Sequence, residues 1–114
     1  MMRTATFLLF CTSGALAAAT GPGSWAPIAD LPGVRDQLGA AALNGKIYVL
    51  GGYDSDGISL KSCVVYDPPA NAWSALADMP GVREAMGAAA LNGKIYVLGG
   101  SADSTSALKS CVVF

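Results

Sequence analysis

The sequence contains no histidine. Histidine is the commonest general base at neutral pH and the commonest metal ligand, so serine–histidine and cysteine–histidine catalytic sets are excluded. Charged residues are also scarce, at 13% of the chain, and the formal net charge is −1. This balance excludes the basic surface that nucleic-acid binding requires and a polybasic membrane-binding patch. The hydrophobic fraction is high, at 53%, which favours strands that are buried on both faces.

A long apolar run is also missing, because the longest one is too short for the roughly 20 residues of a membrane span. It follows a short positive start, Met1-Met2-Arg3, and it precedes small residues at Ala15–Ala19. This order predicts a secretory signal peptide over residues 1–19, cleaved after Ala17 or Ala19, and hence a secreted protein. The alternatives are a poorly ordered apolar leader and a misassigned start codon inside a longer protein, and without a signal peptide the protein is expected in the cytoplasm.

Cysteine is present three times. Cys11 would leave with a signal peptide, while Cys63 and Cys111 are 48 residues apart in matching sequence. Equivalent positions in stacked sheets lie about 10 Å apart, whereas a disulfide needs Cα atoms within about 7 Å. We therefore expect Cys63 and Cys111 to be small buried apolar residues that are not bonded to each other.

The sequence repeats itself with a 48-residue offset. The segment GAAALNGKIYVLGG at 39–52 recurs unchanged at 87–100, and Trp25 aligns with Trp73. A period of this length is typical of solenoids and propellers.

Each unit has the pattern of short antiparallel strands. Residues 39–43 are small and apolar, Asn44-Gly45 is a strong hairpin signal, and residues 46–50 are β-branched or aromatic. Further strands are expected at 60–66 and from Trp73 to about Met79. Four antiparallel strands make one propeller blade, so the sequence predicts an all-β fold of four-stranded antiparallel sheets.

The unit resembles the kelch repeat. That motif has an arginine before a small-residue strand, four hydrophobic residues before a double glycine, and then a spaced tyrosine and tryptophan. In the first copy these are Arg35, 47–50, Gly51-Gly52, Tyr66 and Trp73; in the second copy they are Arg83, 95–98 and Gly99-Gly100. The second copy departs from the motif because Phe114 replaces the tyrosine and no second tryptophan follows.

The resemblance implies an architecture and a role for several residues. It implies a kelch-type β-propeller in which Arg35 and Arg83 are structural and the double glycines turn the backbone. The ligand-facing position in kelch propellers lies two residues after the arginine, at Gln37 and Ala85. Some family members carry an arginine there to grip acidic peptides, and this chain does not.

The loop after the first double glycine contains Tyr53, Asp54 and Asp56, which we place at the ligand-facing edge. The two aspartates have part of a calcium-loop spacing, but the further oxygen ligands and the distal glutamate are missing. We therefore predict a solvated surface loop, and no metal, cofactor or catalytic residue.

The repeats divide the chain into a leader at 1–19, a linker with an unpaired outer strand at 20–31, a complete repeat at 32–79 and a second repeat at 80–114 that lacks its fourth strand. Propellers close with about four to eight blades, so two repeats predict an incomplete ring. Three explanations are open: a fragment of a larger propeller, self-assembly with copies of itself, and a marginal, partly folded domain.

Kelch propellers present loops at the mouths of the ring, so the resemblance implies a non-enzymatic binding or scaffold module with a protein partner of unknown identity. The alternative is a fragment of a secreted kelch enzyme, galactose-oxidase-like or sialic-acid-mutarotase-like, whose catalytic residues lie outside this chain. A truncated copy without function is the third alternative.

Overall fold

The structure is a computed structural model, and it describes residues 21–114. The predicted signal peptide at 1–19 and Cys11 lie outside the described residues. In the described part, no helix is long and apolar enough to cross a membrane.

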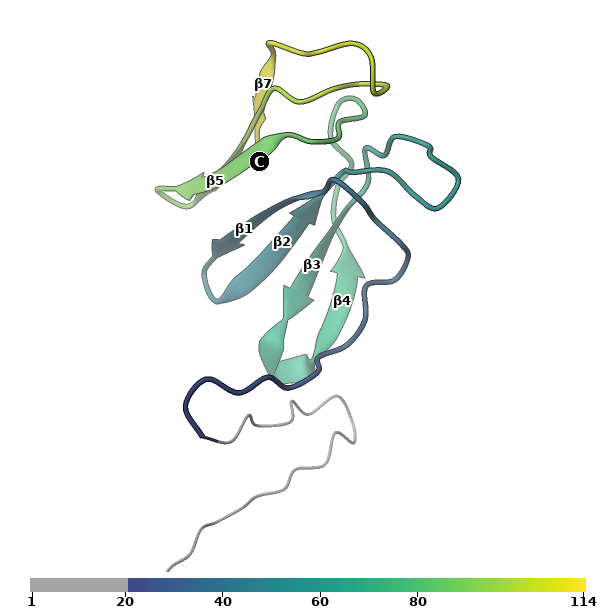
Figure 1. The fold of residues 1–114 in the computed structure, drawn as a ribbon. Coiled ribbons are helices and arrows are strands. Elements are labelled where there is room, and N and C mark those ends of the chain that lie inside the picture. The colour runs from purple at the N-terminus through teal and green to yellow at the C-terminus, as the bar shows by residue number, and fades with distance from the viewer. Residues whose placement is uncertain (1–20) are drawn as a thin grey trace, which may run out of the picture.

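The first sheet has four antiparallel strands that pair in chain order (Figure 1). They are β1 (Gly39–Leu43), β2 (Lys46–Leu50), β3 (Cys63–Asp67) and β4 (Ala72–Ala75). Asn44 and Gly45 both have positive φ, at 53° and 77°, which confirms the predicted hairpin turn between β1 and β2. The short 3₁₀ helix η2 (Pro68–Ala70) joins β3 to β4.

The second sheet repeats this arrangement with three antiparallel strands: β5 (Gly87–Leu91), β6 (Lys94–Leu98) and β7 (Cys111–Val113). Its register copies that of the first sheet, because Gly39 pairs with Leu50 and Gly87 pairs with Leu98. The all-β class and the blade-like antiparallel sheets are therefore confirmed.

Two predicted strands differ in extent from those observed. The third strand begins at Cys63 and not at Leu60, because the backbone groups of residues 60–62 bond to other segments. Leu60 donates to Gly52, and Lys61 accepts from Met79. The fourth strand ends at Ala75, although Leu76 and Met79 still donate hydrogen bonds to Cys63 O and Lys61 O.

The segment at 24–31, predicted to be an unpaired outer strand, forms no strand pairing in this structure. It does not pair with β4 or β7, which both lie at a sheet edge in the described residues. It is held instead by Ala29, whose N–H donates to Asn71 Oδ1 at 2.9 Å and whose carbonyl accepts from Trp73 Nε1 at 2.9 Å.

The core lies between the two sheets, as expected of neighbouring blades. The first strands, β1 and β5, pack against each other, and the sheets diverge toward their later strands (Figure 1). The first sheet contributes the face that carries Leu50 and Cys63. The second sheet contributes Ile95 and Val97, which lie on the face opposite to that of Leu98, the counterpart of Leu50. Met79 and Met86 from the crossing segment complete the cluster.

Cys63 and Cys111 are free thiols with different environments. Cys63 is buried in the core as predicted, whereas Cys111 is exposed, which corrects the prediction for the second copy. The same residue type differs in burial because a second sheet covers the face of β3 but nothing in the described residues covers the matching face of β7.

Candidate functional site

The double glycines bend the chain where the two sheets meet. Gly51 and Gly52 have φ of 57° and 93°, in the left-handed region that favours glycine. A Cβ on Gly51 would lie 2.4 Å from the carbonyl oxygen of Arg83, and a Cβ on Gly52 would lie 2.5 Å from that of Asp36. Gly52 also donates its N–H to Arg83 O at 2.8 Å. The first double glycine therefore permits direct backbone contact between the sheets.

Each repeat arginine closes its own sheet. Arg35 donates from Nη1 to the carbonyls of Gly51 and Ser62, at 3.0 and 2.8 Å, and from Nη2 to Ser62 Oγ at 2.9 Å. Arg83 makes the same three bonds to Gly99 and Ser110, at 2.7 to 2.9 Å. The planar guanidinium suits this forked geometry. Because both arginines point into their own sheets, they serve as structural ties.

The residues two positions after the arginines, Gln37 and Ala85, lie next to each other. The N–H of Ala85 donates to Gln37 O at 2.8 Å, which links the two sheets. Both residues are exposed, and both have positive φ, at 51° and 55°, which is uncommon for residues other than glycine. We call this pair the inner rim. The side chain of Gln37 also donates to Tyr53 Oη at 3.4 Å, so Tyr53 belongs to the same surface.

Two loops adjoin the inner rim, and their sequences differ although the strands match. They are residues 54–59 and residues 102–107, and both extend from the same end of the sheets (Figure 1). Asp54 Oδ1 accepts from the N–H groups of Asp56 and Ile58, at 2.9 and 3.0 Å. Asp54 therefore shapes its loop, while Asp56 is exposed at the loop surface.

The second loop uses an aspartate at a shifted position for the same purpose. Asp103 Oδ1 accepts from the N–H groups of Thr105 and Ser106, at 3.1 and 2.8 Å, and from Thr105 Oγ1. These hydrogen bonds, led by that from the Thr105 hydroxyl, hold the pKa of the Asp103 carboxyl below its usual range.

Glu84 joins the two loops, and the sequence reasoning missed it. Its carboxylate is 1% exposed and accepts from Ser59 Oγ at 2.8 Å and from Ser104 Oγ at 2.6 Å. Ser59 lies in the first loop and Ser104 in the second. The only sequence signal was an acidic residue directly after each arginine, at Asp36 and Glu84. The exposed Asp36 instead accepts from the N–H of Gln37 at 2.8 Å.

The motif residues Tyr66 and Trp73 support the far end of the first sheet. Their rings lie 5.0 Å apart, and Tyr66 donates its hydroxyl to Asn71 Oδ1 at 2.7 Å. This pair is remote from the inner rim in the strand register, since Tyr66 pairs with Ile47 next to the hairpin turn.

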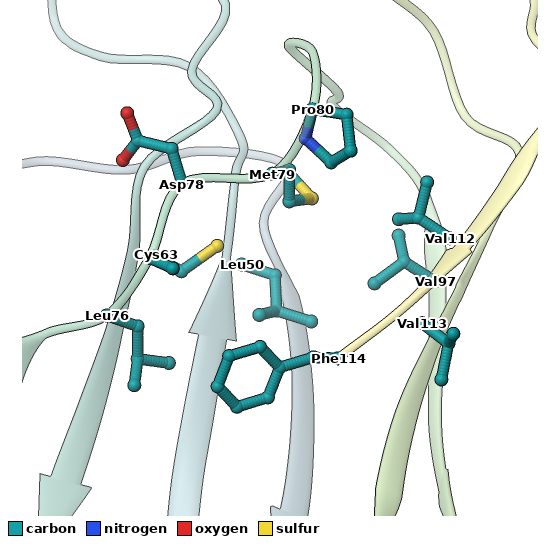
Figure 2. Close-up of a pocket in the computed structure, with 11 residues that line it drawn as sticks. Leu50, Cys63, Leu76, Asp78, Met79, Pro80, Val97, Val112, Val113 and Phe114 are labelled. Atoms are coloured by element: carbon teal, nitrogen blue, oxygen red, sulfur yellow. The ribbon is translucent and has the colours of Figure 1, made fainter.

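A small apolar cavity of about 70 Å³ lies between the sheets. Leu50, Cys63, Met79 and Phe114 point toward it (Figure 2). Ligand pockets are several times larger, so this space is a packing gap. Burial raises the pKa of the Cys63 thiol above its usual value, although backbone hydrogen bonds partly oppose the shift.

In residues 21–114, no three His, Cys, Asp or Glu side chains gather where they could hold a metal ion.

The Kelch motif family matches residues 35–80 of this chain. The chain therefore contains a kelch repeat. The match covers the first repeat, with Arg35, the double glycine, Tyr66 and Trp73. The second repeat has the same strand register and the same arginine ties, so it is a kelch blade in form as well.

A similar segment occurs in an F-box/kelch-repeat protein of Arabidopsis thaliana. The two are 49% identical over 45 residues, which are 40% of this chain and 12% of that protein. The similarity therefore extends over a segment about the length of one repeat.

Proposed function

We propose that this kelch chain is a non-enzymatic protein-binding module that recognises its partner with the inner rim and the two adjoining loops. One observation carries the proposal: two loops of different sequence, on otherwise near-identical repeats, are fixed side by side by the buried Glu84 carboxylate. Variable loops on a constant sheet scaffold are a common basis of recognition.

Chemical features of the loops also support recognition of a protein. Tyr53 and Gln37 offer an aromatic ring and an amide, and Ile58 is an exposed apolar side chain on the first loop. Aromatic and apolar anchors with nearby polar groups are typical of protein interfaces. Kelch repeats generally mediate contacts between proteins, and the F-box/kelch-repeat relative fits this pattern.

The proposal is tested by quantitative affinity capture with matched variants. The Tyr53→Ala/Ile58→Ser variant changes the loop surface, and the Lys46→Ala/Lys94→Ala variant changes exposed residues at the opposite, hairpin end of the sheets. We expect partners captured by the parent to be lost from the loop variant and kept by the hairpin variant. Equal capture by all three proteins would contradict a loop-based binding surface.

We further propose that the protein is exported, on the order of positive, apolar and small residues at 1–19. Expression in a secreting host tests this directly. The expected product in the medium begins at Ala18 or Thr20, and retention of the full leader on cell-associated protein would contradict export.

A further inference from the structure

The differences between the two repeats are confined almost entirely to one end of the sheets. The matching strands, the hairpin turns and the repeat arginines are the same in both copies. The residues that differ lie at 36–38 and 53–59 in the first repeat and at the matching positions in the second. Outside these segments, the compared lengths differ only where Phe114 replaces Tyr66.

The varying segments come together at the loop end of each sheet. Asp36 forms an isolated bridge with Tyr53, and Glu84 forms the same bridge with Ser101. Among the varying residues, Glu84 and Met86 are buried, whereas all the others are exposed or half-buried. A packed scaffold that stays constant while one accessible end varies is the arrangement of a recognition surface.

In the first repeat, the varying residues form a partly apolar surface. We call Gln37, Tyr53 and Ile58 the first subsite. Gln37 Nε2 donates to Tyr53 Oη at 3.4 Å, and Ile58 is 58% exposed. The first subsite therefore offers an aromatic ring and an aliphatic side chain, which suit an apolar side chain of a partner.

In the second repeat, the same three positions hold small or hydroxyl-bearing residues. They are Ala85, Ser101 and Ser106, which we call the second subsite. The loop that follows Ser101 carries hydroxyl groups and the carboxylate of Asp103, and residues 101–107 include no large apolar side chain. Hydroxyl groups both donate and accept hydrogen bonds, so the second subsite suits a polar side chain.

The two subsites adjoin across the boundary between the sheets. The N–H of Ala85 donates to Gln37 O at 2.8 Å. Ser59 and Ser104, one from each loop, bond to the same Glu84 carboxylate. Side chains on one face of an extended segment recur about every 7 Å. A few residues of extended chain therefore span both subsites.

We propose that the partner of this loop surface is an extended protein segment that places an apolar side chain on the first subsite and a polar side chain on the second. We base this on the proposed function, to which it adds the chemistry of the bound segment and the residues that set specificity. Selectivity follows because a polar side chain held against the Tyr53 ring and Ile58 would lose hydrogen bonds to water without replacing them.

Two exchange variants test the inference, because each gives one repeat the residues that the other already accommodates. The first-subsite exchange is Gln37→Ala/Tyr53→Ser/Ile58→Ser, and the second-subsite exchange is Ala85→Gln/Ser101→Tyr/Ser106→Ile. Positions 37 and 85 have nearly the same backbone conformation, with φ of 51° and 55°, so exchange between them adds no backbone strain.

The Lys46→Ala/Lys94→Ala variant is the control, since it changes exposed residues at the hairpin end of the sheets. Circular dichroism and urea unfolding establish that every variant is folded. The probe is a display library of random short peptides, which is selected separately on the full chain and on each variant.

We expect the peptides enriched by the parent and by the control to share one apolar position and one nearby polar position. The first-subsite exchange should lose the apolar preference and bind a parent-selected peptide about tenfold or more weakly, as expected on loss of an aromatic anchor. The second-subsite exchange should select peptides with apolar residues at both positions.

The outcomes separate this inference from the proposed function. No enrichment by the parent over the bare support, or equal binding of the selected peptides by the parent and the first-subsite exchange, would overturn both. Peptides that the first-subsite exchange loses, but that share no apolar and polar pair or that the second-subsite exchange selects unchanged, would overturn the inference and leave loop-based binding intact.

Discussion

Single residues of the same type, repeated 48 positions apart, occupy different environments in the two sheets. Gly51 and Gly99 have almost the same φ, 57° and 59°, and each accepts a hydrogen bond from its repeat arginine. Their surroundings differ, because a Cβ on Gly51 would meet Arg83 O at 2.4 Å, and one on Gly99 would meet Leu108 O at 3.2 Å. Substitutions at Gly99 and Gly51 therefore distinguish the cost of a left-handed backbone, which both positions share, from the cost of steric crowding, which is greater at Gly51.

We expect Gly99→Ala to lower the free energy of unfolding by roughly 1–2 kcal/mol, the cost of a left-handed alanine. Gly51→Ala should cost roughly 2 kcal/mol more, since the added methyl group must displace backbone as well. Urea unfolding of both variants measures the difference. Equal losses would contradict the close approach of the two sheets at Gly51.

The two cysteines give a second matched pair. Burial raises the pKa of Cys63, so the folded state holds this proton more tightly than the unfolded state does. We expect iodoacetamide to modify Cys111 quickly and Cys63 only on unfolding, as measured by mass spectrometry of tryptic peptides. Comparable rates at the two sites in dilute solution would show that Cys63 is not in the core.

The raised pKa also predicts a pH dependence. Protonated Cys63 contributes fully to stability at lower pH, and this contribution is lost as the pH rises above the ordinary thiol value of 9.0. The unfolding free energy of the parent should therefore fall more steeply in alkaline solution than that of Cys63→Ala. Parallel pH profiles for the two proteins would show that the raised pKa of Cys63 does not cause the alkaline loss of stability.

At the scale of elements, the two loops behave as one unit because Glu84 holds both. Replacing Glu84 with leucine removes the acceptor for Ser59 and Ser104, and both loops should lose order together. Hydrogen exchange at residues 53–60 and 101–108 should become faster in Glu84→Leu. Glu84→Gln keeps an acceptor oxygen and should stay close to the parent. Faster exchange in one loop alone would contradict the coupling.

The elements themselves were largely predictable from local patterns. The Asn44-Gly45 turn, the β-branched run at 46–50 and the small residues at 39–43 each prescribe a hairpin, and the structure forms it. The ends of the third and fourth strands were not predictable, because Leu60 donates its N–H to Gly52 O and Met79 donates its N–H to Lys61 O outside the regular ladder. The loop coupling by Glu84 depends on the contact between two repeats, which local sequence does not reveal.

At the scale of the whole molecule, the kelch pattern was sufficient to predict that the two repeats form neighbouring blades. It was insufficient to predict burial in the second blade, since Cys111 and Leu98 have the same local sequence as their buried counterparts. Likewise, the segment at 24–31 has the sequence of a fourth strand but pairs with neither sheet in the described residues. Burial and strand pairing here depend on what lies beside a residue, and not on the residue itself.

The central claim is that the two repeats pack face to face as adjacent blades, which brings their variable loops onto one surface. Nuclear Overhauser spectroscopy of the protein in dilute solution tests this most directly. The claim predicts contacts between the rings of Tyr48 and Phe114, whose centroids are 6.1 Å apart, and between the methyl groups of Leu50 and Val97, which line the same small cavity. A folded protein that shows neither contact would contradict it.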